Sequence, residues 1–131
     1  MTTDDTQAIR ALISRWHAAT AAGDIDTVLG LMAEDAVFLV AGQPPMRGRA
    51  AFGQALRSLL AHSRIESRGE VQEVEVCGDL AWAWSQLSVR IVPAAGGAGG
   101  ARRSGPTLSV FRKQAGSWLL ARDANLLTLD T

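Results

Sequence analysis

Hydrophobic residues recur at spacings of three and four through the first part of the chain. Over residues 4–22 they form one face of an amphipathic helix, and Gly23 ends that pattern. Asp24 is placed to cap a second helix, whose apolar repeat continues to Met32. We therefore expect these two segments to form a helical hairpin.

A short strand and a third helix are expected next. Residues 36–41 are apolar throughout, which is typical of a strand that is buried on both faces. Gly42 and Pro44 end this strand, and Gly48 precedes a helix whose apolar face includes Phe52 and Leu56.

The hydrophobic period changes to two after Arg64. Residues 65–77 and 80–92 are predicted strands joined by a tight turn, and a change of parity among the valines of the first strand suggests a β-bulge. The glycine-rich segment 93–105 is expected to be a mobile loop before a second hairpin, over residues 107–113 and 118–128. Three helices with one early strand, followed by four antiparallel strands, indicate an α+β fold.

Strand alternation predicts which side chains face inward. In the strand over residues 80–92 we expect one face to point toward a pocket, and this face carries Trp82, Trp84, Gln86 and Ser88. The opposite, outer face of the sheet is then predicted to carry Ala81, Ala83, Leu87, Val89, Ile91, Leu108, Val110 and Leu120. So much contiguous apolar surface favours a homodimer that forms through the outer face of the sheet.

Composition limits the classes of function. The chain has 131 residues, of which 47% are apolar and 20% charged, so we expect a single domain over residues 1–131. Thirteen basic residues balance thirteen acidic ones, which argues against nucleic acid or an anionic membrane as a partner. No apolar run approaches the roughly 18 residues of a membrane span, and the acidic start does not look like a targeting segment, so we expect a cytoplasmic protein. One cysteine and two histidines make a poor metal inventory, and no cofactor is expected.

Several short motifs resemble one family. Arg15-Trp16, the run 23–26 (Gly-Asp-Ile-Asp), the run 33–36 (Ala-Glu-Asp-Ala) and the run 42–49 (Gly-Gln-Pro-Pro-Met-Arg-Gly-Arg) are similar to the corresponding stretches of ketosteroid isomerases and SnoaL-like polyketide cyclases. This resemblance implies the cone-shaped fold of the nuclear transport factor two-like superfamily. In that fold a curved, mainly antiparallel sheet holds three N-terminal helices in its concave face and leaves an apolar pocket at its open end.

The resemblance also implies where the isomerase machinery would lie. Its aspartate base falls on Val40, its tyrosine on Trp16 and its second carboxyl group on Ser109. Val40 cannot accept a proton and Trp16 offers only an indole N–H, so the usual ketosteroid isomerisation is disfavoured. SnoaL-like cyclases are similar in carrying an aspartate base on a late strand, where this chain has Asp123.

Asp123 is therefore the candidate general base. The resemblance places Asn125 toward the pocket, and alternation on the last strand then brings Asp123, Ala121 and Leu119 to the same side. The candidate ligand-binding residues are Trp16, Phe38, Val40, Met46, Phe52, Leu56, Trp82, Trp84, Gln86, Ser88, Ser109, Phe111 and Asn125. Structural interpretations stand beside these roles. Asp123 could be a buried acceptor, and the tryptophans could be core residues. His17 lacks a partner ligand at i+3 or i+4 and is interpreted as an edge residue of the first helix rather than a base.

Two classes of function remain open, both with a small apolar or aromatic molecule as partner. The first is an isomerase or cyclase that transfers a proton at a carbon acid with Asp123 as base. The second is a non-catalytic module of the same fold that binds a ligand or dimerises. A hydrolase resembling limonene epoxide hydrolase ranks third, because it would need paired aspartates and an arginine in one pocket.

Overall fold

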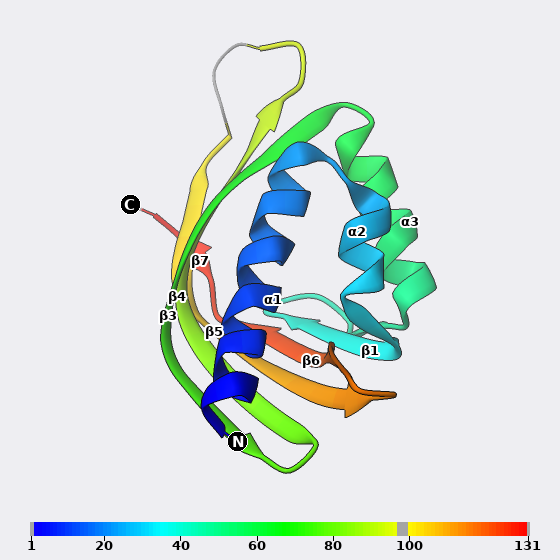
Figure 1. The fold of residues 1–131 in the computed structure, drawn as a ribbon. Coiled ribbons are helices and arrows are strands. Elements are labelled where there is room, and N and C mark those ends of the chain that lie inside the picture. The colour runs from blue at the N-terminus through cyan, green and yellow to red at the C-terminus, as the bar shows by residue number, and fades with distance from the viewer. Residues whose placement is uncertain (1, 97–99, 131) are drawn as a thin grey trace.

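Three helices lie in the concave face of one strongly curved sheet in the computed structural model, which describes residues 2–96 and 100–130 (Figure 1). The helices are α1 (Thr2–Ala22), α2 (Ile25–Gly30) and α3 (Arg49–Leu60). The strands are β1 (Met32–Val40), β2 (Met46–Arg47), β3 (Ser63–Cys77), β4 (Leu80–Pro93), β5 (Arg102–Gln114), β6 (Ser117–Asn125) and β7 (Thr128–Leu129).

The sheet runs in the order β2-β1-β6-β5-β4-β3, with β7 paired to β5. β1 and β6 are parallel, whereas the other pairs are antiparallel. Figure 1 shows α1 lying along the concave face while α2 and α3 close the far side of the cone. The predicted α+β, cone-shaped fold is confirmed.

Local signals set the helix boundaries. Asp24 caps α2 by accepting hydrogen bonds from the Thr27 amide and hydroxyl, at 3.3 and 2.7 Å. Gly48 starts α3 with φ 95°, and its amide donates to the Ala36 carbonyl of β1 at 2.7 Å. The predicted extension of the second helix to Met32 is wrong, because α2 ends at Gly30 and Met32 already pairs with β6.

The first long hairpin forms as expected, but β4 faces the other way. β3 has a register shift between Val71 and Glu73, which confirms the predicted bulge. Ala81 and Ala83 are buried at 1% exposure in the core cluster with Ile9 of α1. The buried face of β4 is therefore the one that carries the alanines, and the predicted facing of the strand is wrong.

Four residues predicted to face the pocket consequently point to the outer face of the sheet: Trp82, Trp84, Gln86 and Ser88. The Trp84 indole donates to Glu73 on β3 at 3.0 Å, and Trp82 is 37% exposed. Conversely, residues that were predicted to lie on the outer face point inward: Ala81, Ala83, Leu87, Val89 and Leu120.

A second bulge, in β6, was not predicted. Val110 pairs with Arg122 while Phe111 pairs with Leu120, so Ala121 is an extra residue on β6. Because of this residue, Leu120 before the bulge and Asp123 after it face the same side. The predicted inward position of Leu119 is wrong by one residue for the same reason.

The loop before β5 is shorter than predicted. β5 begins at Arg102 rather than near Thr107, because residues 102–105 pair with β4 on one side, and Arg103 and Ser104 also pair with β7. Residues 97–99 of the predicted loop lie outside the described residues. No helix in the described part of the chain is long and apolar enough to cross a membrane.

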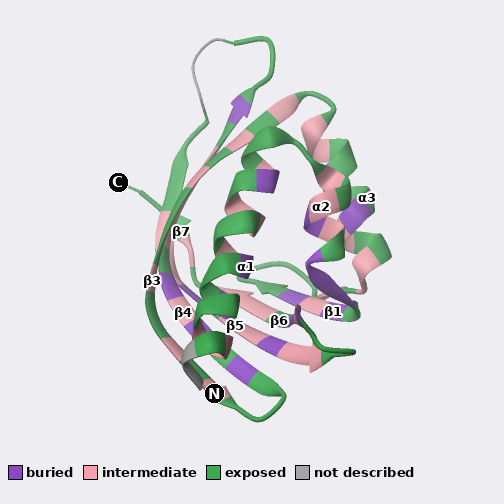
Figure 2. Cartoon of the chain, in the orientation of Figure 1, coloured by how far each residue is buried: buried purple, intermediate pink, exposed green. Residues whose placement is uncertain are grey.

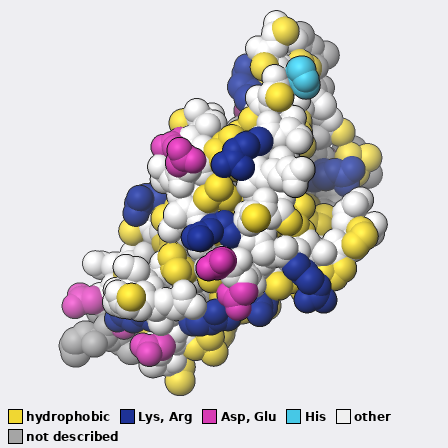
Figure 3. Space-filling model, turned by 90° about the vertical axis from the view of Figure 1, so that its right-hand side faces the viewer, with side chains coloured by type: hydrophobic (Ala, Val, Ile, Leu, Met, Phe, Trp, Pro, Cys, Tyr) yellow, Lys and Arg dark blue, Asp and Glu magenta, His cyan; other side chains and the backbone are white. Residues whose placement is uncertain are grey.

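Figure 2 shows the buried residues gathered between the helices and the concave face, and the outer sides of the helices exposed. The largest fully buried side chains are Phe111, Ile9, Met32 and Val28. On the side where α2 and α3 lie, basic and acidic side chains are scattered among hydrophobic ones (Figure 3). Over that face no single sign of charge forms a continuous patch.

Candidate functional site

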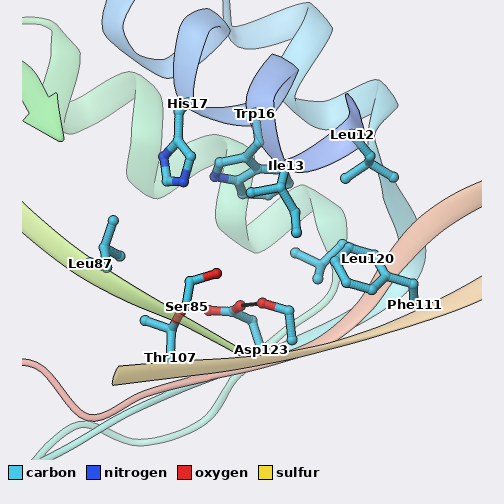
Figure 4. Close-up of a pocket in the computed structure, with 11 residues that line it drawn as sticks. Leu12, Ile13, Trp16, His17, Ser85, Leu87, Thr107, Phe111, Leu120 and Asp123 are labelled. Carbon is cyan, nitrogen blue, oxygen red and sulfur yellow. Dashed lines mark hydrogen bonds between the residues drawn. The ribbon is translucent and has the colours of Figure 1, made fainter. Parts of the chain in front are cut away.

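The site lies between α1 and the concave face of the sheet. The N-terminal end of α1 is tied to the β5–β6 hairpin, because Asp5 accepts hydrogen bonds from the Trp118 indole at 3.1 Å and the Lys113 ammonium at 3.3 Å. Two turns further along, α1 directs Ile13, Trp16 and His17 toward the sheet (Figure 4). This tether fixes the height at which the helix presents these side chains.

An inner cavity of about 90 Å³ separates these side chains from the sheet. It is lined by Leu12, Ile13, Trp16, His17, Ser85, Leu87, Thr107, Ser109, Phe111, Leu120 and Asp123. β4, β5 and β6 supply the floor, and their hydroxyl and carboxyl groups are the polar part of an otherwise mostly apolar lining. This composition is typical of a small-molecule site that orients a ligand by a few polar contacts.

A wider groove of about 630 Å³ opens from the inner cavity and shares Trp16, Leu87 and Asp123 with it. The rings of Trp16, Phe38 and Phe52 form its wall, with Phe38 stacked on Phe52 at 4.4 Å between centroids. The rim carries Gln43, Pro44, Pro45 and Met46 from the segment between β1 and α3, whereas Asn125 and Leu127 come from the C-terminal end. The groove is therefore an aromatic entrance to a smaller polar interior.

Asp123 stands where the two spaces meet. Its carboxyl group accepts a hydrogen bond from the Ser109 hydroxyl at 2.5 Å, across the β5–β6 ladder. Burial raises the pKa of Asp123, and the bond from Ser109 lowers it to a smaller extent. Figure 4 shows the carboxyl group pointing up from β6 into the cavity, toward α1. A carboxylate in this environment is a stronger proton acceptor than one in water.

His17 enters the cavity from the opposite side. Its Nδ1 lies 3.4 Å from the Ser67 hydroxyl oxygen on β3, and burial lowers the pKa of the imidazole. Figure 4 shows the ring hanging from α1 toward the sheet, on the opposite side of the cavity from Ser85 and Asp123. The predicted position at the edge of the helix is therefore wrong, because the ring is directed into the cavity.

The structure gathers most of the candidate residues. Asp123, Trp16, Ser109 and Phe111 line the inner cavity, and the groove is lined by Trp16, Phe38, Val40, Met46, Phe52, Leu56, Asp123 and Asn125. The four residues of β4 named above lie on the other face of the sheet and contribute nothing to either space.

Sequence reasoning did not assign three polar residues to the site. All three line the inner cavity: His17, Ser85 and Thr107. The reversed facing of β4 hid Ser85, although Ala81 and Ala83 in alternation with large residues were a usable signal for a helix packed closely above. Thr107 lies on β5, and no sequence motif singles it out. In the groove, the hydroxyl of Thr20 is buried without a hydrogen-bond partner among the described residues.

Two charged residues close in sequence to candidate site residues, Asp35 and Arg122, have structural roles. Asp35 forms an ion pair with Arg112 at 3.2 Å. Arg122 donates to the Asp35 carbonyl at 3.0 Å, on the side of the sheet away from Asp123. Within residues 2–96 and 100–130, no group of three or more His, Cys, Asp or Glu side chains is arranged to hold a metal ion.

Comparison with known proteins identifies the class and then the family. The curved sheet around three helices, with a cavity below α1, is the nuclear transport factor two-like architecture, and an NTF2-like protein with a cystatin-like fold from Novosphingobium aromaticivorans matches with a TM-score of 0.75 at 25% identity, over 95% of this chain and 82% of that chain. A family model described as a SnoaL-like domain matches residues 13–121, and the chain belongs to this family. No curated protein gives a significant match.

Two further solved structures are similar over nearly their full length. A conserved protein from Planctomyces limnophilus DSM 3776 is 32% identical with a TM-score of 0.91, and the match covers 98% of this chain and 99% of that chain. A ketosteroid isomerase-like protein from Erwinia carotovora atroseptica SCRI1043 is 22% identical with a TM-score of 0.80, and the match covers 97% of each chain. The second likeness shows the fold alone.

Proposed function

We propose that the chain binds a small apolar or aromatic molecule in the cavity and transfers a proton at a carbon acid, as an isomerase or cyclase does. Asp123 is the general base. The observation that carries this proposal is the position of the Asp123 carboxyl group, which is enclosed, accepts one hydrogen bond from Ser109 and points into the cavity.

The environment of Asp123 suits a base. A raised pKa brings the group closer to the operating pH, where a general base combines a useful fraction of carboxylate with a strong affinity for the proton. The bond from Ser109 leaves the second carboxylate oxygen available to a ligand. Apolar neighbours such as Phe111 and Leu120 exclude water that would otherwise compete for it.

The shape of the two spaces supports an elongated, flat ligand. Its apolar body would lie in the groove against Trp16, Phe38 and Phe52, because aromatic walls favour a ring. Its acidic C–H group would lie at the junction beside Asp123. Asn125 on the groove side is available to a polar substituent of the ligand.

Hydrogen exchange into a ketone tests the proposal without knowledge of the natural substrate. The probe is 2-tetralone, a bicyclic ketone whose α hydrogens exchange with D₂O through the enolate, followed by ¹H NMR. We expect the wild-type protein to accelerate exchange and Asp123→Asn to lower that rate roughly 100-fold. Asp26→Asn, an exposed aspartate on α2, is the matched control and should exchange at the wild-type rate.

Two results would contradict the catalytic proposal. One is an exchange rate in Asp123→Asn equal to that of the wild type. The other is binding of 2-tetralone, seen as shifts of cavity resonances, without faster exchange than in protein-free buffer. The second result favours a non-catalytic binding module, for which the aromatic wall of the groove is the supporting observation.

The epoxide-hydrolase alternative has less support. Of the described residues that line the cavity and groove, Asp123 is the one carboxylate and none is an arginine. A second aspartate and an arginine, which that reaction type would need for water activation, have no counterpart in this lining.

A homodimer through the outer face of the sheet is also proposed, with residues that differ in part from those expected. The large apolar side chains exposed on this face include Leu39, Leu80, Trp82 and Leu108, at 37% to 53% exposure. Such a patch favours a partner that covers it, and a second copy offers the same apolar surface. A cytoplasmic location stays a prediction from the sequence.

A further inference from the structure

Gly69 occupies an unexpected place in the middle of β3. Its φ is not positive, so the backbone at this position does not require glycine. Glycine within a strand is destabilising, and often marks a place where another group approaches the backbone closely. Here the approaching group is His17, because a Cβ on residue 69 would lie 2.7 Å from its Nε2 and 3.3 Å from its Cε1.

The same strand holds the other side of the imidazole. Ser67 lies two residues earlier, on the same face of β3, with its hydroxyl oxygen 3.4 Å from Nδ1. If this hydroxyl donates to Nδ1, the imidazole hydrogen is carried by Nε2. The absent side chain at Gly69 leaves room for the ring at Nε2, and β3 acts as a seat that fixes both the position and the tautomer of the ring.

The seated imidazole faces the candidate base across the cavity. The carboxyl group of Asp123 points up from β6, and the ring of His17 points down from α1 (Figure 4). No hydrogen bond joins the two groups, so each remains available to a molecule between them. Burial keeps the pKa of His17 below its ordinary value, so the ring is neutral at neutral pH and can act as a hydrogen-bond donor without adding a positive charge.

We propose that His17, held by Ser67 and Gly69, donates a hydrogen bond from Nε2 to the carbonyl oxygen of the ligand while Asp123 takes the proton from the adjacent carbon. This inference rests on the proposed function and assigns a second group to it. The substrate class it implies is a ketone, or another carbonyl compound, with an acidic C–H beside the carbonyl group.

The step balances as an enolisation. The C–H bond breaks, its proton goes to the Asp123 carboxylate, and the electron pair forms a carbon–carbon double bond as the carbonyl π pair moves to oxygen. The hydrogen bond from His17 strengthens as the oxygen gains negative charge. Return of a proton to the same carbon gives exchange with solvent. If the ligand carries a further carbon–carbon double bond, the enolate is a dienolate, and return of the proton to its γ carbon gives isomerisation.

Two conservative variants separate a donor at Nε2 from a filler of space. The amide nitrogen of glutamine reaches the position of Nε2, whereas that of asparagine reaches only the position of Nδ1. In the 2-tetralone exchange assay we expect His17→Asn to lower kcat roughly 100-fold, in the range observed for loss of one oxyanion donor. His17→Gln should lower kcat only about threefold. A purely structural role would affect both variants alike.

Gly69→Ala tests whether the packing of the His17 ring against β3 matters while the histidine is still present. The added Cβ displaces the ring, so kcat should fall about as far as in His17→Asn. The matched control is Gly30→Ala, because a Cβ at residue 30 meets no atom within 4 Å and the backbone there is not strained. Equal loss in both alanine variants would overturn the role of Gly69 and, with it, the proposed arrangement.

Binding of 2-naphthol keeps this inference separate from the role of Asp123. This molecule has the skeleton of the 2-tetralone enol and needs no base, and its fluorescence reports the dissociation constant. We expect His17→Asn to weaken its binding about tenfold or more, and His17→Gln to weaken it much less. If Asp123→Asn exchanges 2-tetralone at the wild-type rate but His17→Asn loses 2-naphthol, the base fails and the donor stands.

The tautomer gives a test without any ligand. In ¹⁵N-labelled protein at neutral pH, the imidazole nitrogen shifts of His17 should report a hydrogen on Nε2, and Ser67→Ala should reduce that preference. A hydrogen on Nδ1 in the wild-type protein would overturn the inference, as would equal exchange rates and equal 2-naphthol binding in the Gln and Asn variants.

Discussion

Asp123→Asn should change the pH dependence of folding stability in a direction set by burial. The pKa of Asp123 is raised in the folded protein above its unfolded value, which is about 3.9. Below the unfolded pKa the carboxyl group is protonated in both the folded and the unfolded state, so its burial as a charge does not lower the free energy of unfolding. As the pH rises toward the folded pKa, the unfolded state releases its proton first, and the stability of the wild-type protein falls relative to the variant.

The size of this pH dependence follows from the release of one proton by one carboxyl group. In the window between the two pKa values, the free energy of unfolding of the wild type should fall relative to Asp123→Asn by up to about 1.4 kcal/mol per pH unit. Above the folded pKa the difference reaches a plateau. The asparagine carbonyl still accepts the bond from Ser109, so the variant keeps a contribution of about 1 kcal/mol.

Urea denaturation followed by tryptophan fluorescence, from pH 4 to 8 at one protein concentration, measures this difference. Ser109→Ala is an informative companion, because the bond from Ser109 lowers the pKa of Asp123 and its loss should extend the window to higher pH. A difference that is constant with pH would refute the reasoning. A variant that becomes less stable than the wild type as the pH rises would show that the fold stabilises the carboxylate instead.

Three further changes have defined expectations. Phe111→Ala should lower the free energy of unfolding by about 3 to 5 kcal/mol in chemical denaturation, because the ring is 1% exposed; a change below about 1 kcal/mol would contradict its place in the core. Gly48→Val should lower stability by about 1 to 3 kcal/mol, because φ is 95° at the start of α3, and an unchanged melting curve would contradict this cost. Leu108→Lys should convert a dimer to a monomer in light scattering, and a monomeric wild type at micromolar concentration would contradict the dimer.

Features that depend on neighbouring residues could be predicted from the sequence. The cap at Asp24, the glycine start of α3 and the bulge in β3 each result from residues within a few positions of one another. The end of α2 could not be predicted in this way, because the helical repeat extends to Met32 while pairing with β6 draws that residue into a strand. Tertiary hydrogen bonding overrode the local pattern there.

The facing of β4 depended on packing that alternation alone does not reveal. Either face of the strand is consistent with a period of two, and large aromatic residues suggested the inside. The structure buries the alanine face of β4, since Ala81 and Ala83 belong to the core cluster and are 1% exposed. The partnership of His17 with Gly69 was likewise beyond reach, since it joins a helix to a strand some fifty residues away.

The extra residue in β6 divides the strand into two parts, and the inward side chains of the two parts have opposite parity in the sequence. Residues before Ala121 point even-numbered side chains at the core, and residues after it point odd-numbered side chains at the cavity. Without Ala121, Leu120 would still lie opposite Phe111 and Arg122 opposite Val110, so the strand would alternate regularly and Asp123 would keep its place opposite Ser109. The bulge therefore absorbs one residue of strand length, and the functional group of the cavity keeps its position whether or not that residue is present.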